Sequence, residues 1–121
     1  MKPDKDFIRR IMLDVVASKE PQLPKFTYPE MDKYAVNWHV NHLIECGFLR
    51  GVPLINKGSG LVEDVANISV DPLKGYAFVT ALEDDTLWNH FKTWLVRAAA
   101  SAVPTTASAL WEYLQNYLKT I

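Results

Sequence analysis

The fold is decided by residues 36–60, which read VNWHVNHLIECGFLRGVPLINKGSG. Successive residues of a helix are rotated by about 100°, so three apolar side chains of the first half share one line: Val36, Val40 and Leu43. Gly47 continues this line and suits the position after a helix, because glycine adopts the left-handed conformation at little cost. Two β-rich runs then flank the small polar tip 56–60, which is typical of a hairpin. The stretch predicts a helix from about residue 29 or 30 to 47 and a β-hairpin over 48–70.

Helical spacing also occurs before this stretch. Residues 3–18 carry apolar side chains three and four positions apart, which predicts a one-faced helix. The segment 19–29 holds three prolines, which remove backbone donors and disfavour helix at the residues before them. We therefore expect a connector between the first two helices.

Three further helices are expected after the hairpin. Asp71-Pro72 is typical of a helix start, and this helix would run to about residue 83 with a core face of Tyr76, Val79 and Leu82. Asp84-Asp85 predicts the cap of the next helix, whose apolar side chains keep helical spacing: Trp88, Phe91, Leu95 and Ala98. The segment 107–121 has an apolar stripe and predicts a terminal helix.

These elements predict one domain, residues 1–121, that is mainly α with a small β-hairpin (α+β). A chain of 121 residues can bury a core without disulfides or metals. No apolar run approaches the roughly 18 residues of a bilayer span, and the acidic opening is unlike a signal peptide. The single cysteine, Cys46, fits a reducing compartment. We expect a cytoplasmic protein with no membrane partner.

The order helix, helix, hairpin is that of a winged-helix module, in which the helix before the hairpin enters the major groove of DNA. Residues 1–70 would form this winged-helix-like unit, and 71–121 a helical extension. Asn37 and Asn41 would face the groove together with Trp38, because asparagine can bond bidentately to adenine. Phosphates would be contacted by three cations: Lys33, Arg50 and Lys57.

The charge distribution fits this DNA-binding hypothesis only for one half of the chain. The sequence holds 13 Lys and Arg against 14 Asp and Glu, a net charge of −1. Residues 1–60 contain nine basic and seven acidic side chains, giving +2, and residues 61–121 contain four and seven, giving −3. Binding to double-stranded DNA would therefore be modest and markedly weakened by salt.

The sequence resembles a bacterial and prophage-associated family known as a domain of unknown function. The likeness lies in residues 1–13, in residues 34–49 with Trp38-His39 and Cys46-Gly47-Phe48, and in Gly75-Tyr76-Ala77-Phe78-Val79 followed by Asp84-Asp85-Thr86-Leu87-Trp88-Asn89. Asp71-Pro72-Leu73 departs from the family pattern, which has a Leu-Thr strand end at this point. The resemblance implies a winged-helix-like fold with no established activity. Together with the order of the elements, it leads to the hypothesis of a phage- or prophage-derived DNA-binding regulator of transcription.

A non-catalytic protein-interaction module is the alternative function. Trp38 could anchor a phage or host protein, or pack on a neighbouring element of its own chain. The stripe on the terminal helix could cover the core of the same chain or form a two-fold dimer through four residues: Leu110, Trp111, Leu114 and Leu118.

No enzyme, cofactor or metal is expected. The chain lacks the phosphate-loop, nucleophile-elbow, zinc-protease and dinucleotide motifs. His39, His42 and Cys46 fall on one side of a helix and could ligate a soft metal, but one helix rarely orients three ligands, so core packing is the preferred interpretation. Asp84 and Asp85 could pair as catalytic carboxylates, although a helix cap explains them more simply.

Overall fold

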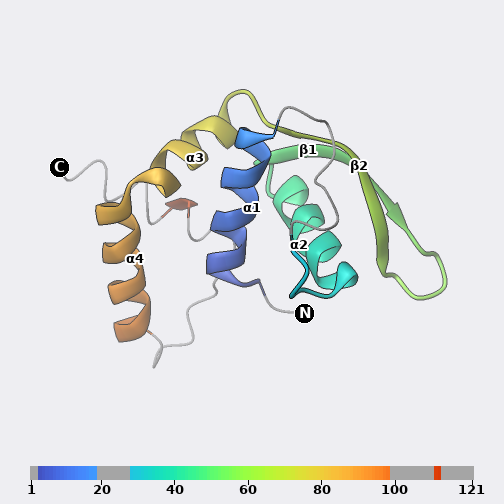
Figure 1. Ribbon diagram of the computed structural model, residues 1–121, viewed down its shortest axis with the longest axis horizontal. Helices are drawn as coiled ribbons and strands as arrows, with labels where there is room; N and C mark the ends of the chain where they lie inside the picture. Colours follow the sequence, from blue (N-terminus) through green and yellow to red (C-terminus); the bar gives the residue numbers. More distant parts are fainter. Residues whose placement is uncertain (1–2, 19–27, 99–110, 113–121) are drawn as a thin grey trace.

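The computed structural model describes residues 3–18, 28–98 and 111–112. Within them, four helices and one hairpin follow in the order α1 (Lys5–Ala17), α2 (Lys33–Glu45), β1 (Leu49–Ile55), β2 (Val62–Val70), α3 (Lys74–Glu83) and α4 (Asp85–Ala98) (Figure 1). The α+β class with one small hairpin is thus confirmed. No helix in these described segments is long and apolar enough to cross a membrane.

Helix α1 lies at the centre of the molecule, between α2 on one side and α4 on the other (Figure 1). Its start is fixed by Asp4, whose carboxylate accepts hydrogen bonds from the backbone N–H groups of Asp6 and Phe7. Its apolar stripe is buried: Phe7, Ile8, Ile11, Met12 and Val15. The predicted helix over 3–18 is confirmed except for its first two residues and its last, which flank the helix.

Helix α2 begins at Lys33 rather than at residue 29 or 30, because Asp32 caps it by accepting from Tyr34 N–H. It ends at Glu45, two residues before the predicted end, and Gly47 has the predicted role in the turn that follows the helix. Gly47 has a φ of 86°, and the N–H groups of Gly47 and Phe48 donate to the carbonyls of Ile44 and Leu43. This pair of bonds is a Schellman motif, which turns the chain directly into β1.

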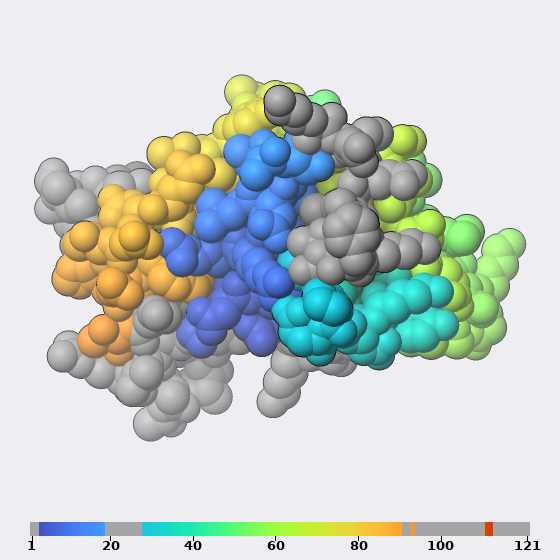
Figure 2. Space-filling view, viewed as in Figure 1, coloured from blue at the N-terminus to red at the C-terminus, as the bar shows by residue number. Residues whose placement is uncertain are grey.

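The hairpin is antiparallel, with pairs from Leu49 and Val70 at its base to Ile55 and Val62 near its tip. Its inner face covers α2 and contributes five buried side chains to the core: Leu49, Val62, Val65, Ile68 and Val70. The hairpin residues form the end of the molecule opposite α4, and the tip projects beyond α2 (Figure 2). The predicted hairpin over 48–70 is confirmed.

The core face of α3 agrees with the prediction at Val79 and Leu82 but not at Tyr76. Tyr76 is 53% exposed, and the buried stripe consists of Gly75, Phe78, Val79, Ala81 and Leu82. The predicted residues were three positions apart throughout, which drifts around a helix of 3.6 residues per turn. Gly75 determines the face, because a Cβ at this position would lie 2.3 Å from the carbonyl oxygen of Phe48.

The start of α4 was predicted correctly. Asp84 Oδ1 accepts from the backbone N–H of Leu87 at 3.0 Å, and Trp88 is buried. The side chains of Phe91, Leu95 and Ala98 lie outside the described part. Of the predicted terminal helix, residues 111 and 112 are described and are helical.

Candidate interaction surface

The predicted DNA-reading face of α2 lies partly against the hairpin. Asn37 Nδ2 donates to the carbonyl oxygens of Val62 at 3.2 Å and Glu63 at 3.0 Å, and the Tyr34 hydroxyl donates to Glu63 Oε2 at 3.3 Å. Both donors of the Asn37 amide group are therefore used to hold β2 on α2. Asn37 acts in the structure as an anchor of the hairpin.

Asn41 and Trp38 occupy different surroundings on the same helix. Asn41 Nδ2 donates to Glu45 Oε1 at 3.2 Å on the exposed side. Trp38 is half-buried and packs on its own chain: its ring stacks on His42, with centroids 5.3 Å apart and planes inclined by 4°, and meets His39 edge-on. The Trp38 ring therefore already has aromatic neighbours on its own helix, one beside it in the sequence and one a turn away.

The three predicted phosphate contacts are distributed over the start of α2, the base of the hairpin and its tip. Lys33 Nζ lies 3.8 Å from Glu63 Oε2, and Arg50 Nε lies 3.3 Å from Asp71 Oδ1. Lys57 is exposed at the tip. Two of the three cations thus face acidic side chains, which reduces the positive potential that they would present to DNA.

Trp111, predicted for a dimer stripe or for the core, packs on its own chain. Its ring lies edge-on to Phe48 and Phe78, with centroids 6.0 and 5.9 Å away. Leu110, Leu114 and Leu118 lie outside the described residues. The contacts of Trp111 agree with the expectation that this segment covers the core of the same chain.

The His39, His42 and Cys46 side chains do not form a metal centre. Within the described segments, no group of three or more His, Cys, Asp or Glu residues is arranged to hold an ion. Both ring nitrogens of His39 have backbone partners, Asp4 N–H and Ala35 O. His42 Nε2 lies 3.9 Å from Cys46 Sγ, and this bond is the main reason why the pKa of His42 is raised.

The acidic pair before α4 has structural partners. Asp84 caps α4, and Asp85 Oδ1 accepts from Arg9 Nη2 at 2.9 Å. The two carboxylates therefore point to separate partners, as expected for a helix cap and a neighbouring ion pair. The absence of catalysis stays a prediction.

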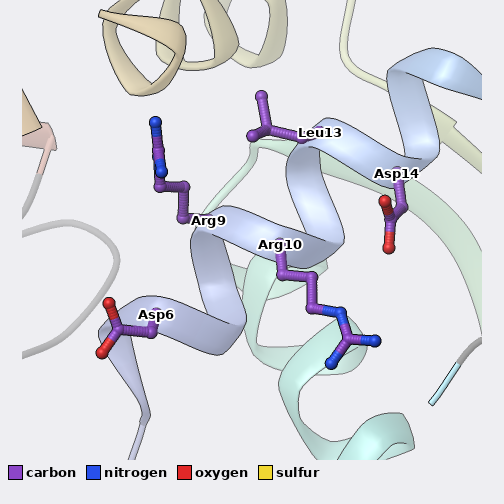
Figure 3. Close-up of a pocket in the computed structure, with 5 residues that line it drawn as sticks. All are labelled: Asp6, Arg9, Arg10, Leu13 and Asp14. Carbon is purple, nitrogen blue, oxygen red and sulfur yellow. The ribbon is translucent and has the colours of Figure 1, made fainter. Parts of the chain in front are cut away.

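A hollow on the outer side of α1 is lined by Asp6, Arg9, Arg10, Leu13 and Asp14 (Figure 3). Arg9 and Arg10 point away from each other. Arg9 Nε donates to Leu82 O at 2.8 Å and its guanidinium pairs with Asp85, while Arg10 pairs with Glu30. Because these cations are used within the chain, the hollow offers no converging groups for a ligand.

Among the described residues, exposed apolar side chains gather on the hairpin, mainly on the side that turns away from α2. Paired residues of an antiparallel ladder share a face, and three such pairs make up this side: Arg50 with Ser69, Val52 with Ala66, and Leu54 with Asp64. We call these six residues the outer hairpin face. Val52 is 62% and Leu54 65% exposed, and Ile55 and Leu61 are exposed near the tip.

Sequence reasoning missed this surface. Residues 49–55 were recognised as a strand, yet their hydrophobic composition was not assigned to two faces. Alternate residues of a strand share one face, and this spacing could have revealed the surface. Arg50, Val52 and Leu54 alternate with residues that are all less exposed. A charged residue in this series indicates that the whole series faces away from the core.

Comparison with models of protein families, with curated proteins and with solved structures finds no match for the chain. The resemblance to a prophage family therefore stays a prediction, as do the winged-helix interpretation and the DNA-binding hypothesis. The outer hairpin face is the surface from which a function can be argued.

Proposed function

We propose that the chain is a non-catalytic protein-interaction module that binds through the outer hairpin face. One observation carries this proposal: among the described residues, Val52 and Leu54 of this face are 62% and 65% exposed, and two further exposed apolar side chains, Ile55 and Leu61, lie beside it near the tip. Single exposed apolar residues are ordinary on proteins, whereas a group of them on one element is typical of a binding surface.

The occupant that fits this face best is a second copy of the same chain. Arg50 and Asp64 lie at diagonal corners of the face, with Val52 between them on the ladder. Consider a two-fold axis that passes Val52, runs parallel to the face and is perpendicular to the line from Arg50 to Asp64. This axis lays the faces of the two copies on each other and brings Arg50 of each copy to Asp64 of the other. Such an isologous contact uses one patch twice and covers the apolar centre of both copies.

The side chains at both corners are available for this contact. Asp64 is exposed, and no residue in the described part forms an ion pair with it. The Arg50 side chain is 65% exposed although it pairs with Asp71. The charges add selectivity for one orientation, and apolar burial supplies the main driving force.

Self-association is tested by sedimentation velocity over a series of protein concentrations. We expect the wild-type average mass to rise with concentration and Val52→Asp to remain a monomer, because this substitution places a charge at the centre of the contact. Leu73→Asp is the matched control: Leu73 is 85% exposed, lies before α3 and is not one of the six residues of this face. A wild-type chain that stays monomeric at every concentration would overturn the proposal, as would equal effects of the two variants.

DNA binding is the second candidate function. It is supported by the order of α2 and the hairpin and by the exposed Lys57 at the tip. Fluorescence anisotropy with a labelled duplex at low salt tests it. Binding that falls on Lys57→Ala and disappears with added salt would support this candidate, whereas no binding by a folded wild-type chain would remove it.

A further inference from the structure

His39 is a buried imidazole that joins α2 to the start of α1. It is 3% exposed, and its Nε2 accepts the backbone N–H of Asp4 at 3.0 Å. Its Nδ1 lies 2.7 Å from the carbonyl oxygen of Ala35. The rings of Phe7 and Trp38 meet the imidazole edge-on, each with centroids 5.0 Å away. Asp4 is the cap of α1, so this bond holds the end of that helix on α2.

The two partners determine the protonation state of the ring. A carbonyl oxygen can only accept, so Nδ1 carries the hydrogen that Ala35 receives. A backbone N–H can only donate, so Nε2 must keep its lone pair. Both bonds exist together only in the neutral Nδ1–H tautomer. A proton on Nε2 would face the Asp4 N–H, and the bond between α1 and α2 would be lost.

We propose that His39 is a pH-sensitive latch, which fixes the start of α1 to α2 when the ring is neutral and releases it when the ring is protonated. The latch consists of His39, Asp4 and Ala35. It is a property of the helical core and is independent of the proposed self-association of the hairpin.

The charged groups around the latch act in both directions. The Asp4 carboxylate on α1 favours the protonated ring, but it is held as the cap of α1 by the N–H groups of Asp6 and Phe7. His42 on α2 opposes protonation. Burial outweighs the other contributions, so the pKa of His39 lies below its ordinary value.

The sign of the pH dependence follows from this lowered pKa. Above about pH 6.5 the ring is neutral in the folded and unfolded chain, and the latch contributes no pH dependence. As the pH falls below this value, the unfolded chain takes up the proton first, so folding becomes less favourable. The loss continues until the pH passes the folded pKa and then stops. It amounts to as much as about tenfold in the unfolding equilibrium constant per pH unit.

The direct test is nuclear magnetic resonance of the wild-type chain between pH 8 and pH 5. We expect the nitrogen shifts of His39 to show the Nδ1–H tautomer at high pH. Protection of the Asp4 amide from hydrogen exchange, corrected for the intrinsic rate, should fall as the ring is protonated. An Nε2–H tautomer at pH 8 would overturn the proposal, as would unchanged Asp4 protection once His39 is charged.

Two variants separate the latch from the second histidine of α2. His39→Gln can place an amide oxygen near the Nε2 position, which accepts from Asp4 without titrating, so the acid loss of stability should disappear. His42→Gln is the matched control and should steepen the loss, because the raised pKa of His42 contributes stability at low pH. A His39→Gln chain with the wild-type pH dependence would contradict the latch. If this variant does not fold, the wild-type titration decides the question.

Discussion

Single residues fix the places where the elements begin, end and approach one another. Gly75 is the clearest case, because α3 packs directly on the base of the hairpin at this position. A Cβ there would lie 2.3 Å from Phe48 O and 2.6 Å from Val70 Cγ1. The first atom belongs to the backbone, so a side chain cannot be accommodated by a rotamer change.

Gly75→Ala should therefore destabilise the chain although alanine favours helices. We expect a loss of about 1–3 kcal/mol in the free energy of unfolding, the usual cost of overpacking. Chemical denaturation measures it. Gly58→Ala at the exposed tip is the control and should change stability little, because the one neighbouring atom of its Cβ would be Asn56 Oδ1, at 3.4 Å. Equal stability of the Gly75→Ala and wild-type chains would show that α3 does not pack this closely.

The sequence was informative at two positions where a residue acts through its own local conformation or side-chain hydrogen bond. Gly47 and Asp84 were assigned to the end of α2 and the cap of α4, and both have these roles. The prediction was wrong at Asp71-Pro72, because α3 begins at Lys74 and Leu73 occupies its cap position. Tyr76 was assigned wrongly, because its burial depends on where the hairpin presses on α3. No property of Tyr76 itself carries this information.

At the scale of elements, helix α2 shows that helical periodicity alone does not tell which polar side chains are exposed. The rotation of 100° per residue placed Asn37 away from the apolar line of α2, and this side of the helix was interpreted as facing DNA. In the structure, β2 covers Asn37, and the amide group satisfies two strand carbonyls. Periodicity within one element defines relative positions around its axis, whereas a neighbouring element decides which polar positions remain open.

Asn37→Ala should loosen the hairpin from α2. Two carbonyl oxygens lose their donor, so we expect a cost of about 1–3 kcal/mol and faster amide exchange in β2. Asn41→Ala, one turn along on the exposed side, is the matched control and should cost at most about 0.5 kcal/mol. Hydrogen exchange and denaturation check both variants. If the two variants are equally stable, the Asn37 bonds do not hold the hairpin.

For the molecule as a whole, Trp111 distinguishes the core of one chain from a contact between copies. Its ring touches Phe48 and Phe78, which are both fully buried. Residues far apart in the sequence thus meet at one place in the core. Periodicity of the segment 107–121 predicted an apolar stripe but could not decide whether this stripe covers its own chain.

Trp111→Ala should lower thermal stability without changing self-association. We expect a loss of about 1–4 kcal/mol, because Trp111 is half-buried and its aromatic contacts disappear. Calorimetry measures the stability, and sedimentation measures the mass. A variant that keeps wild-type stability but loses self-association would place Trp111 in an interface between copies.

The proposed binding surface also emerges only at this scale, from the division of the hairpin into a covered and an open face. The sequence contained the alternation of residues 50, 52 and 54, but the charged corners were recognisable only once the register paired Leu54 with Asp64. The central proposal is that these corners orient two copies about a two-fold axis.

Sedimentation of charge-reversed variants tests this proposal most directly. Arg50→Asp and Asp64→Arg should each weaken self-association, because each brings like charges together twice in a dimer. The double variant restores opposite charges and should recover most of the loss, roughly 0.4–2 kcal/mol for two exposed pairs. A double variant that associates no better than the single variants, while remaining folded, would contradict the two-fold contact of the outer hairpin face.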